Sequence, residues 1–380
     1  MPATDRLRAL TTGADAMLWG RRASVWLGNL AWGSTLGGAL EQLAGANVLL
    51  RTGDPLFAAL ALIELDGVAA RIVIVPPELK DEHLPAIAER TAVTAVVGED
   101  SALALPGIRF VRATLPLTPL AEAPPPRETE WVLFTAGTTG VPKLVSHSLG
   151  SLTGAIRADA VKNGAVRDAV WGTFYDVRRY GGLQILLRAL SGRVSLILPD
   201  DGEEAGDFLV RLGRHGVTHL SGMPSHWRRA LMSPANLKIA PRNVRLSGEV
   251  ADQAMLDSLR TRFPAAAIVH AYGSTEAGVG FEVNDGREGF PAAIVGQPGA
   301  VEVKLVDGSL HIRSPRIAHG YVDGKELLTE GFVDTGDLVE LWGDRYFFVG
   351  RRGGAVDTGG AARKEEGAGR RQSSVTMDQF

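Results

Sequence analysis

Short apolar runs alternate with stretches of helical period along most of the chain. Residues 71–77, RIVIVPP, and residues 194–200, VSLILPD, are rich in β-branched residues and end in proline or a polar residue, as buried strands do. Residues 251–263 have a helical period instead. The apolar face of that segment carries Met255, Leu256, Leu259 and Phe263. This alternation predicts an α/β fold with layered helices and largely parallel sheets.

The pattern changes at about residue 295. Two segments with alternating polar and apolar positions are centred on Asp307–Gly308 and Gly343–Asp344, and such dipeptides between alternating arms indicate β-hairpins. A smaller antiparallel region is therefore expected to pack beside the α/β part.

The same patterns suggest four parts. A polar, proline-rich connector at 121–130 separates a first α/β subdomain, 1–125, from a second, 126–294, which holds the main glycine-rich loop. The small antiparallel region covers 295–352. Residues 353–380, rich in glycine and charge, are expected to be a hinge remnant followed by a disordered tail.

Composition narrows the class of protein. The chain has 380 residues, 45% of them hydrophobic, with 40 basic and 43 acidic residues and a formal net charge of −3. This balance gives no electrostatic reason to expect nucleic acid or a membrane surface as a partner. The absence of cysteine excludes disulfides, thiolate metal sites and a cysteine nucleophile. No apolar run approaches the ~18 residues of a membrane span, and the first residues do not resemble a secretory signal, so a cytoplasmic protein is expected.

The stretch VLFTAGTTGVPK, 132–143, could hold phosphate. Its spacing does not fit the Walker loop or the dinucleotide fingerprint. Glycines nevertheless let backbone N–H groups turn toward an anion, and hydroxyl groups and a lysine are present. An ordinary glycine-rich turn after a strand has the same composition, so both alternatives stay open for this loop alone. Its candidate phosphate-binding residues are Thr135, Gly137, Thr138, Thr139, Gly140 and Lys143.

Two further stretches carry acids at strand ends. IVHAYGSTEAGVG, 268–280, places Glu276 beside two hydroxyl residues, where a carboxylate can hold Mg²⁺ next to phosphates. GFVDTGDLVEL, 331–341, contains Asp337, which could accept hydrogen bonds from a ribose diol. Each acid alone is no more than a loop residue. The three stretches together indicate a nucleotide site.

Together these motifs make the chain similar to the ANL superfamily of adenylate-forming enzymes. FTAGTTGVPK resembles its phosphate loop, with Ala136 where a serine is usual, AYGSTEAG resembles its Y-G-x-T-E motif, and DTGDL its T-G-D motif. The likeness extends over about residues 130–354. It implies an ANL-type large domain with two α/β layered subdomains and a small antiparallel β region. A C-terminal domain that supplies a lysine follows in family members, and on this comparison it is expected to be missing here.

The resemblance also implies residue roles. Lys143, Thr275 and Glu276 would be catalytic, with Glu276 the Mg²⁺ ligand. Asp337 and Arg351 would bind the ribose, and Tyr272 would stack on the adenine. The remaining nucleotide-binding positions implied, besides those of the phosphate loop, are Gly248, Glu249, Gly273 and Ser274.

The acid pocket is expected between the segment after the phosphate loop and the Y-G-x-T-E region, with residues 173–190 as its wall and residues 220–224 and Ala271 completing it. Its aromatic residues favour an aryl or short acid over a long chain, unless they are core residues. The candidate substrate residues are Phe174, Tyr175, Arg179, Tyr180, Gly181, Gly182, Gly222, Met223 and Ala271.

The implied reaction is the ATP-dependent activation of a carboxylic acid to an acyl-adenylate, with release of pyrophosphate. The acyl group would pass to the thiol of coenzyme A or to the phosphopantetheine of a carrier protein. One alternative is a protein that binds nucleotide or acyl-adenylate with impaired catalysis. Another is transfer of the acyl group to an alcohol or an amine.

Overall fold

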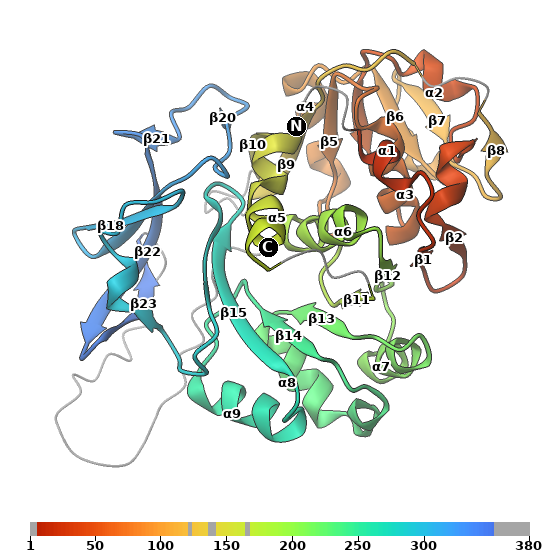
Figure 1. Ribbon diagram of the computed structural model, residues 1–380. Helices are drawn as coiled ribbons and strands as arrows, with labels where there is room; N and C mark the ends of the chain where they lie inside the picture. The colour runs from red at the N-terminus through yellow and green to blue at the C-terminus, as the bar shows by residue number, and fades with distance from the viewer. Residues whose placement is uncertain (1–5, 121–123, 136–141, 164–167, 353–380) are drawn as a thin grey trace.

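The computed structural model describes residues 6–120, 124–135, 142–163 and 168–352, with side chains 160–163 omitted. Within these ranges the chain forms a mixed α/β fold with two large sheets, a smaller third sheet and a two-stranded pair of β3 (Gly33–Ser34) with β8 (Thr118–Pro119) (Figure 1). The predicted fold class is therefore confirmed. The predicted tail at 353–380 and four phosphate-loop residues, Gly137, Thr138, Thr139 and Gly140, lie outside the described residues.

The first large sheet is mostly parallel and has seven strands among the described residues. In order across the sheet they are β20 (Gly320–Tyr321), β10 (Lys143–Ser148), β9 (Glu130–Thr135), β5 (Arg71–Ile74), β4 (Asn47–Leu50), β6 (Ala95–Gly98) and β7 (Arg109–Arg112). Strands β9 to β7 run parallel, whereas β10 and β20 add antiparallel. The central strands are buried almost throughout, as parallel strands covered on both faces are.

The second large sheet has eight strands in the described part of the chain. In order they are β16 (Gly278–Val283), β15 (Ala267–Ser274), β14 (Asn243–Leu246), β13 (His219–Gly222), β11 (Val170–Thr173), β12 (Ser195–Ile197), β1 (Met17–Trp19) and β2 (Ser24–Trp26). All neighbours are parallel except the two edge pairs, β15–β16 and β1–β2.

The smaller sheet is antiparallel, as the sequence predicts. Its strands in order are β17 (Phe290–Pro291), β23 (Arg345–Arg351), β22 (Phe332–Trp342), β19 (Ser309–Arg313) and β18 (Glu302–Val306), with β21 (Leu328–Thr329) paired to β22. Both predicted hairpins are present, since Val306 pairs with Ser309 and Trp342 with Arg345. The two-residue turn at Asp307–Gly308 has positive φ at both positions, which is the geometry of a tight hairpin.

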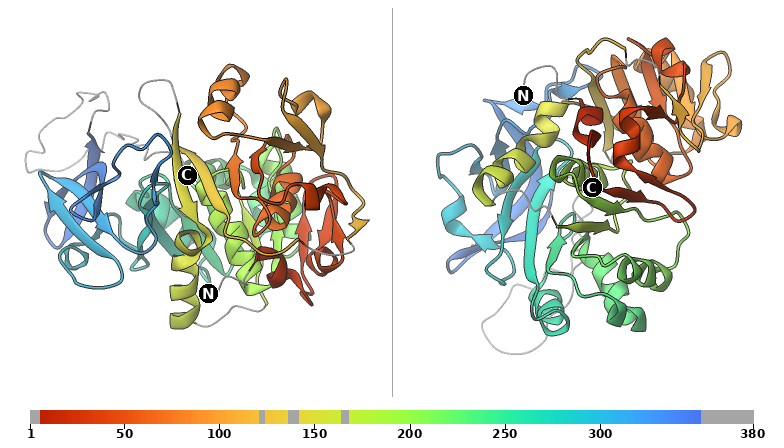
Figure 2. Two further views of the ribbon diagram at one scale, coloured as in Figure 1. Left: turned by 90° about the horizontal axis from the view of Figure 1, so that it is seen from above. Right: turned by 45° about the vertical axis from the view of Figure 1, so that its right-hand side comes forward.

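Helices cover the two large sheets and fill the space between them. They are α1 (Leu7–Thr11), α2 (Ala39–Gln42), α3 (Pro55–Leu65), α4 (Leu84–Arg90), α5 (Leu149–Asn163), α6 (Tyr180–Gly192), α7 (Ala205–Arg214), α8 (Pro224–Met232) and α9 (Gln253–Arg262). Helix α9 confirms the predicted helical segment, and its apolar face is buried. In Figures 1 and 2, α6 lies centrally, and its apolar side chains belong to a core cluster that contains residues of both large sheets.

The sheets do not follow the predicted division at residue 125. Strands β9 and β10, from the predicted second subdomain, complete the first sheet, and β1 and β2 join the second. Strand β20, from the predicted antiparallel region, pairs with β10. Long-range pairing of this kind leaves no local pattern in the sequence, because the apolar pattern of a strand does not depend on which sheet the strand joins.

Candidate active site

Strands β9 and β10 bring two of the predicted phosphate-loop residues together. They form an antiparallel pair in which Thr135 lies opposite Lys143. The Thr135 hydroxyl is buried and has no hydrogen-bond partner in the part of the chain that the structure describes. Lys143 is exposed, with its Nζ 5.5 Å from the centre of the Tyr321 ring. The end of this hairpin therefore offers a hydroxyl group and a cation to a ligand.

The turn after β15 carries Thr275 and Glu276 and is held by its main chain. His147 on β10 donates from Nε2 to the Thr275 carbonyl at 2.7 Å, and the Ala318 N–H donates to the Glu276 carbonyl at 2.9 Å. Ser274 Oγ accepts from the Ala277 N–H at 3.0 Å. These bonds fix the turn against β10, so that the predicted metal ligand and the phosphate-loop hairpin lie on neighbouring elements.

His147 is a positioning residue that the sequence analysis missed. Its ring is fully buried, with Nδ1 3.0 Å from Ser151 Oγ. Burial lowers the pKa of His147 to about 4, so the ring is neutral near pH 7 and keeps one N–H for the Thr275 carbonyl. The only sequence signal is a histidine near the end of an apolar strand, which is more often a core residue.

Tyr272 and Asp337 are joined directly. The Tyr272 hydroxyl donates to Asp337 Oδ2 at 2.5 Å, and Arg351 lies opposite Asp337 in the β22–β23 pair. Tyr272 also stacks with Phe281 and Phe348, at ring-centre distances of 5.3 and 5.2 Å. Burial, followed by the Asp337 carboxylate, raises the pKa of Tyr272. The proposed ribose ligands and the proposed adenine-stacking residue therefore meet in one buried cluster.

The Tyr272 ring lies against two other aromatic rings in this structure. Only 3% of its surface is exposed, and Phe281 and Phe348 stack with it. The sequence shows the tyrosine but not the phenylalanines beside it, because Phe281 pairs with Tyr272 across a strand pair and Phe348 comes from the smaller sheet. Stacking on adenine would require one of these rings to move.

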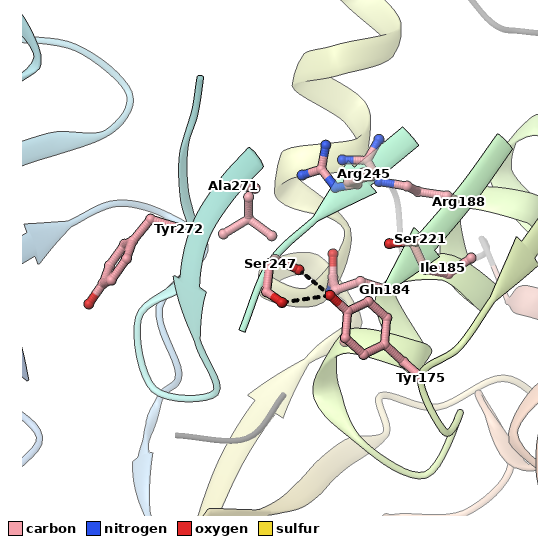
Figure 3. A pocket seen from close by; sticks show the side chains of 11 residues that line it. Tyr175, Gln184, Ile185, Arg188, Ser221, Arg245, Ser247, Ala271 and Tyr272 are labelled. Carbon is pink, nitrogen blue, oxygen red and sulfur yellow. Dashed lines mark hydrogen bonds between the residues drawn. The ribbon is translucent and has the colours of Figure 1, made fainter. Parts of the chain in front are cut away.

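A cavity opens between α6 and β15 (Figure 3). The predicted substrate residues in its wall are Tyr175, Gly181 and Ala271. The Tyr175 hydroxyl is 2.8 Å from both the carbonyl oxygen and the Oγ of Ser247, so this tyrosine is fixed rather than free to turn toward a ligand. Tyr272 also borders the cavity, which places it beside the Tyr272–Asp337 cluster.

Other predicted substrate residues lie outside this cavity wall. Phe174 packs on Phe208 and Trp227 in the core, and Arg179 forms an ion pair with Glu78. Met223 precedes α8 as its N-terminal cap residue. For these three, the interpretation as core or surface residues describes the observed contacts.

Tyr180 and two glycines complete the correction. Tyr180 is buried with its ring 5.8 Å from that of His147. A Cβ at Gly182 would lie 2.0 Å from the Asp176 carbonyl oxygen, and one at Gly222 would lie 2.6 Å from Phe174. These glycines allow close packing instead of leaving room for substrate.

Seven further residues of the cavity wall are not among the candidates named one by one, although four of them lie in the expected wall stretches 173–190 and 220–224. They are Gln184, Ile185, Arg188, Ser221, Arg245, Ser247 and Val279. Three of them follow Gly181 at helical spacing on α6, which places them on one face of that helix. The others come from strands that meet only in the folded sheet.

A second cavity lies on the other side of β15. It is lined by Glu249, Val250, Ala251, His270, Ala271, Tyr272, Phe281, Gly289, Phe290 and Phe348. The Glu249 carboxylate accepts hydrogen bonds from the main chain and the hydroxyl of Ser225 at 2.8 and 2.7 Å. Gly248 has φ of +84°, which favours glycine, and Gly273 lies at an irregularity in the β15–β16 pairing. Ala271 and Tyr272 thus separate two cavities.

Comparison with known proteins agrees with the motifs. The AMP-binding enzyme family matches residues 43–322. The 2-succinylbenzoate–CoA ligase of Staphylococcus epidermidis is 26% identical over 249 residues, which cover 60% of this chain and 50% of that ligase. Pyochelin synthetase of Pseudomonas aeruginosa is 29% identical over 292 residues, 68% of this chain and 20% of the synthetase. The chain thus spans about half the length of the first relative and less of the second.

Solved structures share the fold. The o-succinylbenzoate coenzyme A synthetase from Bacillus subtilis in complex with AMP has a TM-score of 0.72 at 18% identity, covering 91% of this chain and 97% of that one. A malonyl-CoA ligase with methylmalonyl-CoA and AMP bound has a TM-score of 0.73 at 22% identity, covering 90% and 78%. With the family match over residues 43–322, these findings show that the chain belongs to the AMP-binding enzyme family of adenylate-forming enzymes.

Proposed function

We propose that this chain activates a carboxylic acid with ATP, forming an acyl-adenylate and pyrophosphate. The acyl group then passes to a thiol, either of coenzyme A or of a carrier protein. The observation that carries the proposal is the position of β15. This strand borders the first cavity through Ala271 and then continues into the Thr275–Glu276 turn, which His147 ties to the β9–β10 hairpin. An acid in the cavity would lie beside nucleotide phosphates at the hairpin.

The chemistry consists of two displacements. A carboxylate oxygen attacks the α-phosphorus of ATP, and the bond from that phosphorus to the oxygen bridging the α- and β-phosphates breaks, which releases pyrophosphate. A thiolate then attacks the acyl carbon and AMP leaves. Both the acid and ATP are anions, so the main tasks of the protein are to hold them together and to offset their charge.

The described residues fit these tasks. The unpartnered hydroxyl of Thr135 and the exposed ammonium of Lys143 would bind phosphate oxygens. Glu276, with Thr275, would hold Mg²⁺, which when bound neutralises phosphate charge and polarises the phosphorus. In the described part of the chain no three potential metal-ligating side chains gather, which suits an ion held by one carboxylate and by substrate phosphates.

The nucleotide base would use the second cavity. Its wall carries Glu249 and Phe290, and it adjoins Asp337 through Tyr272. Asp337 and Arg351 would bind the ribose. We therefore expect nucleotide binding to open the stacking between Tyr272 and Phe348.

The first cavity suits an aryl or short acid. Tyr175 and Ile185 give it apolar walls, while its opposite end is polar. The relatives named 2-succinylbenzoate–CoA ligase and malonyl-CoA ligase support this size range. None of the helices among the described residues is long and apolar enough to cross a membrane. We propose the cytoplasm as the location, where ATP and acyl acceptors are available.

The test is pyrophosphate release measured over a panel of acids with ATP and Mg²⁺, with mass spectrometry of the acyl-adenylate. Coenzyme A, a phosphopantetheinylated carrier protein, an alcohol and an amine are then supplied separately as acceptors. Acid-dependent pyrophosphate with thioester as the product supports the proposal. Formation of an ester or an amide instead would show that the acceptor is an alcohol or an amine and not a thiol.

A binding protein that does not turn over ATP is the second candidate. Nucleotide binding without pyrophosphate from any acid would select this candidate.

A further inference from the structure

Two arginines meet inside the first cavity. Arg188 on α6 and Arg245 on β14 present their guanidinium groups together at one end, and Tyr175 lies at the other (Figure 3). Their side chains are only 8% and 11% exposed. Placing two like charges in a buried site is unfavourable unless anions offset them.

The protein itself offsets this charge incompletely. Glu282 Oε1 lies 2.7 Å from Arg245 Nη2 but 3.7 Å from Arg188 Nη2, which is beyond hydrogen-bond range. Asp159 binds Arg188 Nη1 at 2.7 Å from a position where its side chain is 39% exposed. A third arginine, Arg316, also acts on Glu282: burial alone would raise the pKa of Glu282, but the three guanidinium groups lower it. Among the contacts described, the three guanidinium groups share the carboxylates of Glu282 and Asp159.

Unpartnered polar atoms gather at the same place. Arg188 Nη2, Ser221 Oγ and Gln184 Oε1 are buried and have no hydrogen-bond partner in the described part of the chain. Arg188 and Ser221 offer donors. Gln184, whose Nε2 is bonded to the Leu152 carbonyl, offers an acceptor. Buried donors of this kind require a partner, and an anionic ligand in the cavity would provide one for Arg188 and Ser221.

From this arrangement we infer that the acid carries a second carboxylate, bound by Arg188 and Arg245 with the Ser221 hydroxyl. The inference rests on the proposed function, because it assigns a substrate class to the same cavity. A second carboxylate supplies the missing anion and accepts from both unpartnered donors. The acceptor oxygen of Gln184 repels a carboxylate and directs it toward the arginines. An acid with no second carboxylate would leave Arg188 Nη2 and Ser221 Oγ without a hydrogen-bond partner.

The test compares acids in matched pairs with one or two carboxylates: butyrate with succinate, propionate with malonate, and benzoate with isophthalate. Pyrophosphate release gives kcat/KM for each acid in the presence of ATP and Mg²⁺. In the wild type, the diacid of at least one pair is expected to be favoured by about tenfold or more, the size of a charge-assisted contact.

Two substitutions with opposite expected effects separate recognition from misfolding. Arg188→Met should abolish the diacid preference, so that kcat/KM of each diacid falls to that of its monoacid partner. Glu282→Gln removes the anion that competes for Arg245 and should strengthen the preference. A general loss of structure would lower the rates with both acids in both variants. Arg242→Met, at an exposed ion pair with Asp168, is the matched control and should change neither.

Equal rates for the members of every pair in the wild type, or a diacid preference that survives Arg188→Met, would overturn the inference. If no acid gives pyrophosphate, the proposed catalysis fails and the same acids are titrated by calorimetry. Diacid binding that weakens about tenfold in Arg188→Met then supports the arginine site, whereas the absence of any diacid preference in binding rejects it.

Discussion

At the scale of single residues, the turn at Thr275 and Glu276 is held by its carbonyl oxygens. His147 and Ala318 supply those bonds. Glu276→Gln keeps the size of the side chain and removes a liganding charge. We expect pyrophosphate release at limiting Mg²⁺ to fall by about tenfold or more. Glu340→Gln, at an exposed position, is the control. An unchanged rate at limiting Mg²⁺ would remove Glu276 from the metal site.

Asp337 is expected to govern nucleotide affinity. Asp337→Asn keeps the size of the side chain and removes the charge that would accept from a ribose diol, so the Kd for ATP should rise about tenfold. Tyr272→Phe is the matched comparison, because it removes the hydrogen bond to Asp337 and leaves the carboxylate in place. Calorimetric titration measures both variants. If Asp337→Asn binds ATP as the wild type does, the ribose role is wrong.

His226 gives the protein a defined acid sensitivity. Burial, and then the nearby charge of Arg229, lower the pKa of His226 to about 4, whereas the unfolded chain has an ordinary histidine pKa of about 6.5. Between these values the unfolded state binds more protons, so stability present above about pH 6.5 is lost as the pH falls toward about 4. His226→Asn should flatten this part of the curve, keeping an acceptor for the Met223 N–H. Denaturant unfolding at several pH values checks it, and equal pH slopes in the two proteins would contradict it.

The motifs single out individual residues only where a local stretch of sequence carries the chemistry. Lys143, Glu276 and Asp337 stand out because polar groups follow apolar strands. Arg188 and Arg245 do not, since each is one charged residue in an otherwise structural helix or strand, and their meeting depends on the packing of α6 against the sheet. The sequence also does not show which aromatic residues line a cavity and which fill the core, because this too depends on how the elements pack.

At the scale of elements, α6 depends on a close approach of backbone. A Cβ at Gly182 would lie 2.0 Å from the Asp176 carbonyl oxygen. Gly182→Ala should therefore destabilise the protein by about 2 kcal/mol or more, through displacement of the helix. Gly38→Ala is the control, since its Cβ would meet no atom within 4 Å and its φ is −64°. Equal unfolding midpoints for the two variants would show that α6 tolerates the shift.

Elements with a local signal were predicted reliably. The hairpin at Asp307–Gly308 and helix α9 follow from turn residues and apolar period. The partners of edge strands have no such signal, which is why β1, β2 and β20 were not assigned to their sheets.

At the scale of the whole molecule, the exchange of strands joins the two large sheets into one structure. The largest core cluster contains Val48 and Leu133 from one sheet and Leu18 and Leu196 from the other. We expect a single denaturant transition, because each large sheet contains strands from the part of the chain that forms most of the other sheet. Far-UV circular dichroism and tryptophan fluorescence should give coincident curves. Two separated transitions would show that the sheets unfold independently.

The proposed reaction requires that nucleotide and acid bind next to each other across β15. The most direct test is calorimetric titration with ATP and Mg²⁺, first alone and then with the preferred acid, with pyrophosphate followed in parallel. We expect a heat of binding for ATP with Mg²⁺. We also expect pyrophosphate to appear only when acid and ATP are both present. No binding of ATP, or pyrophosphate release that is independent of acid, would contradict it.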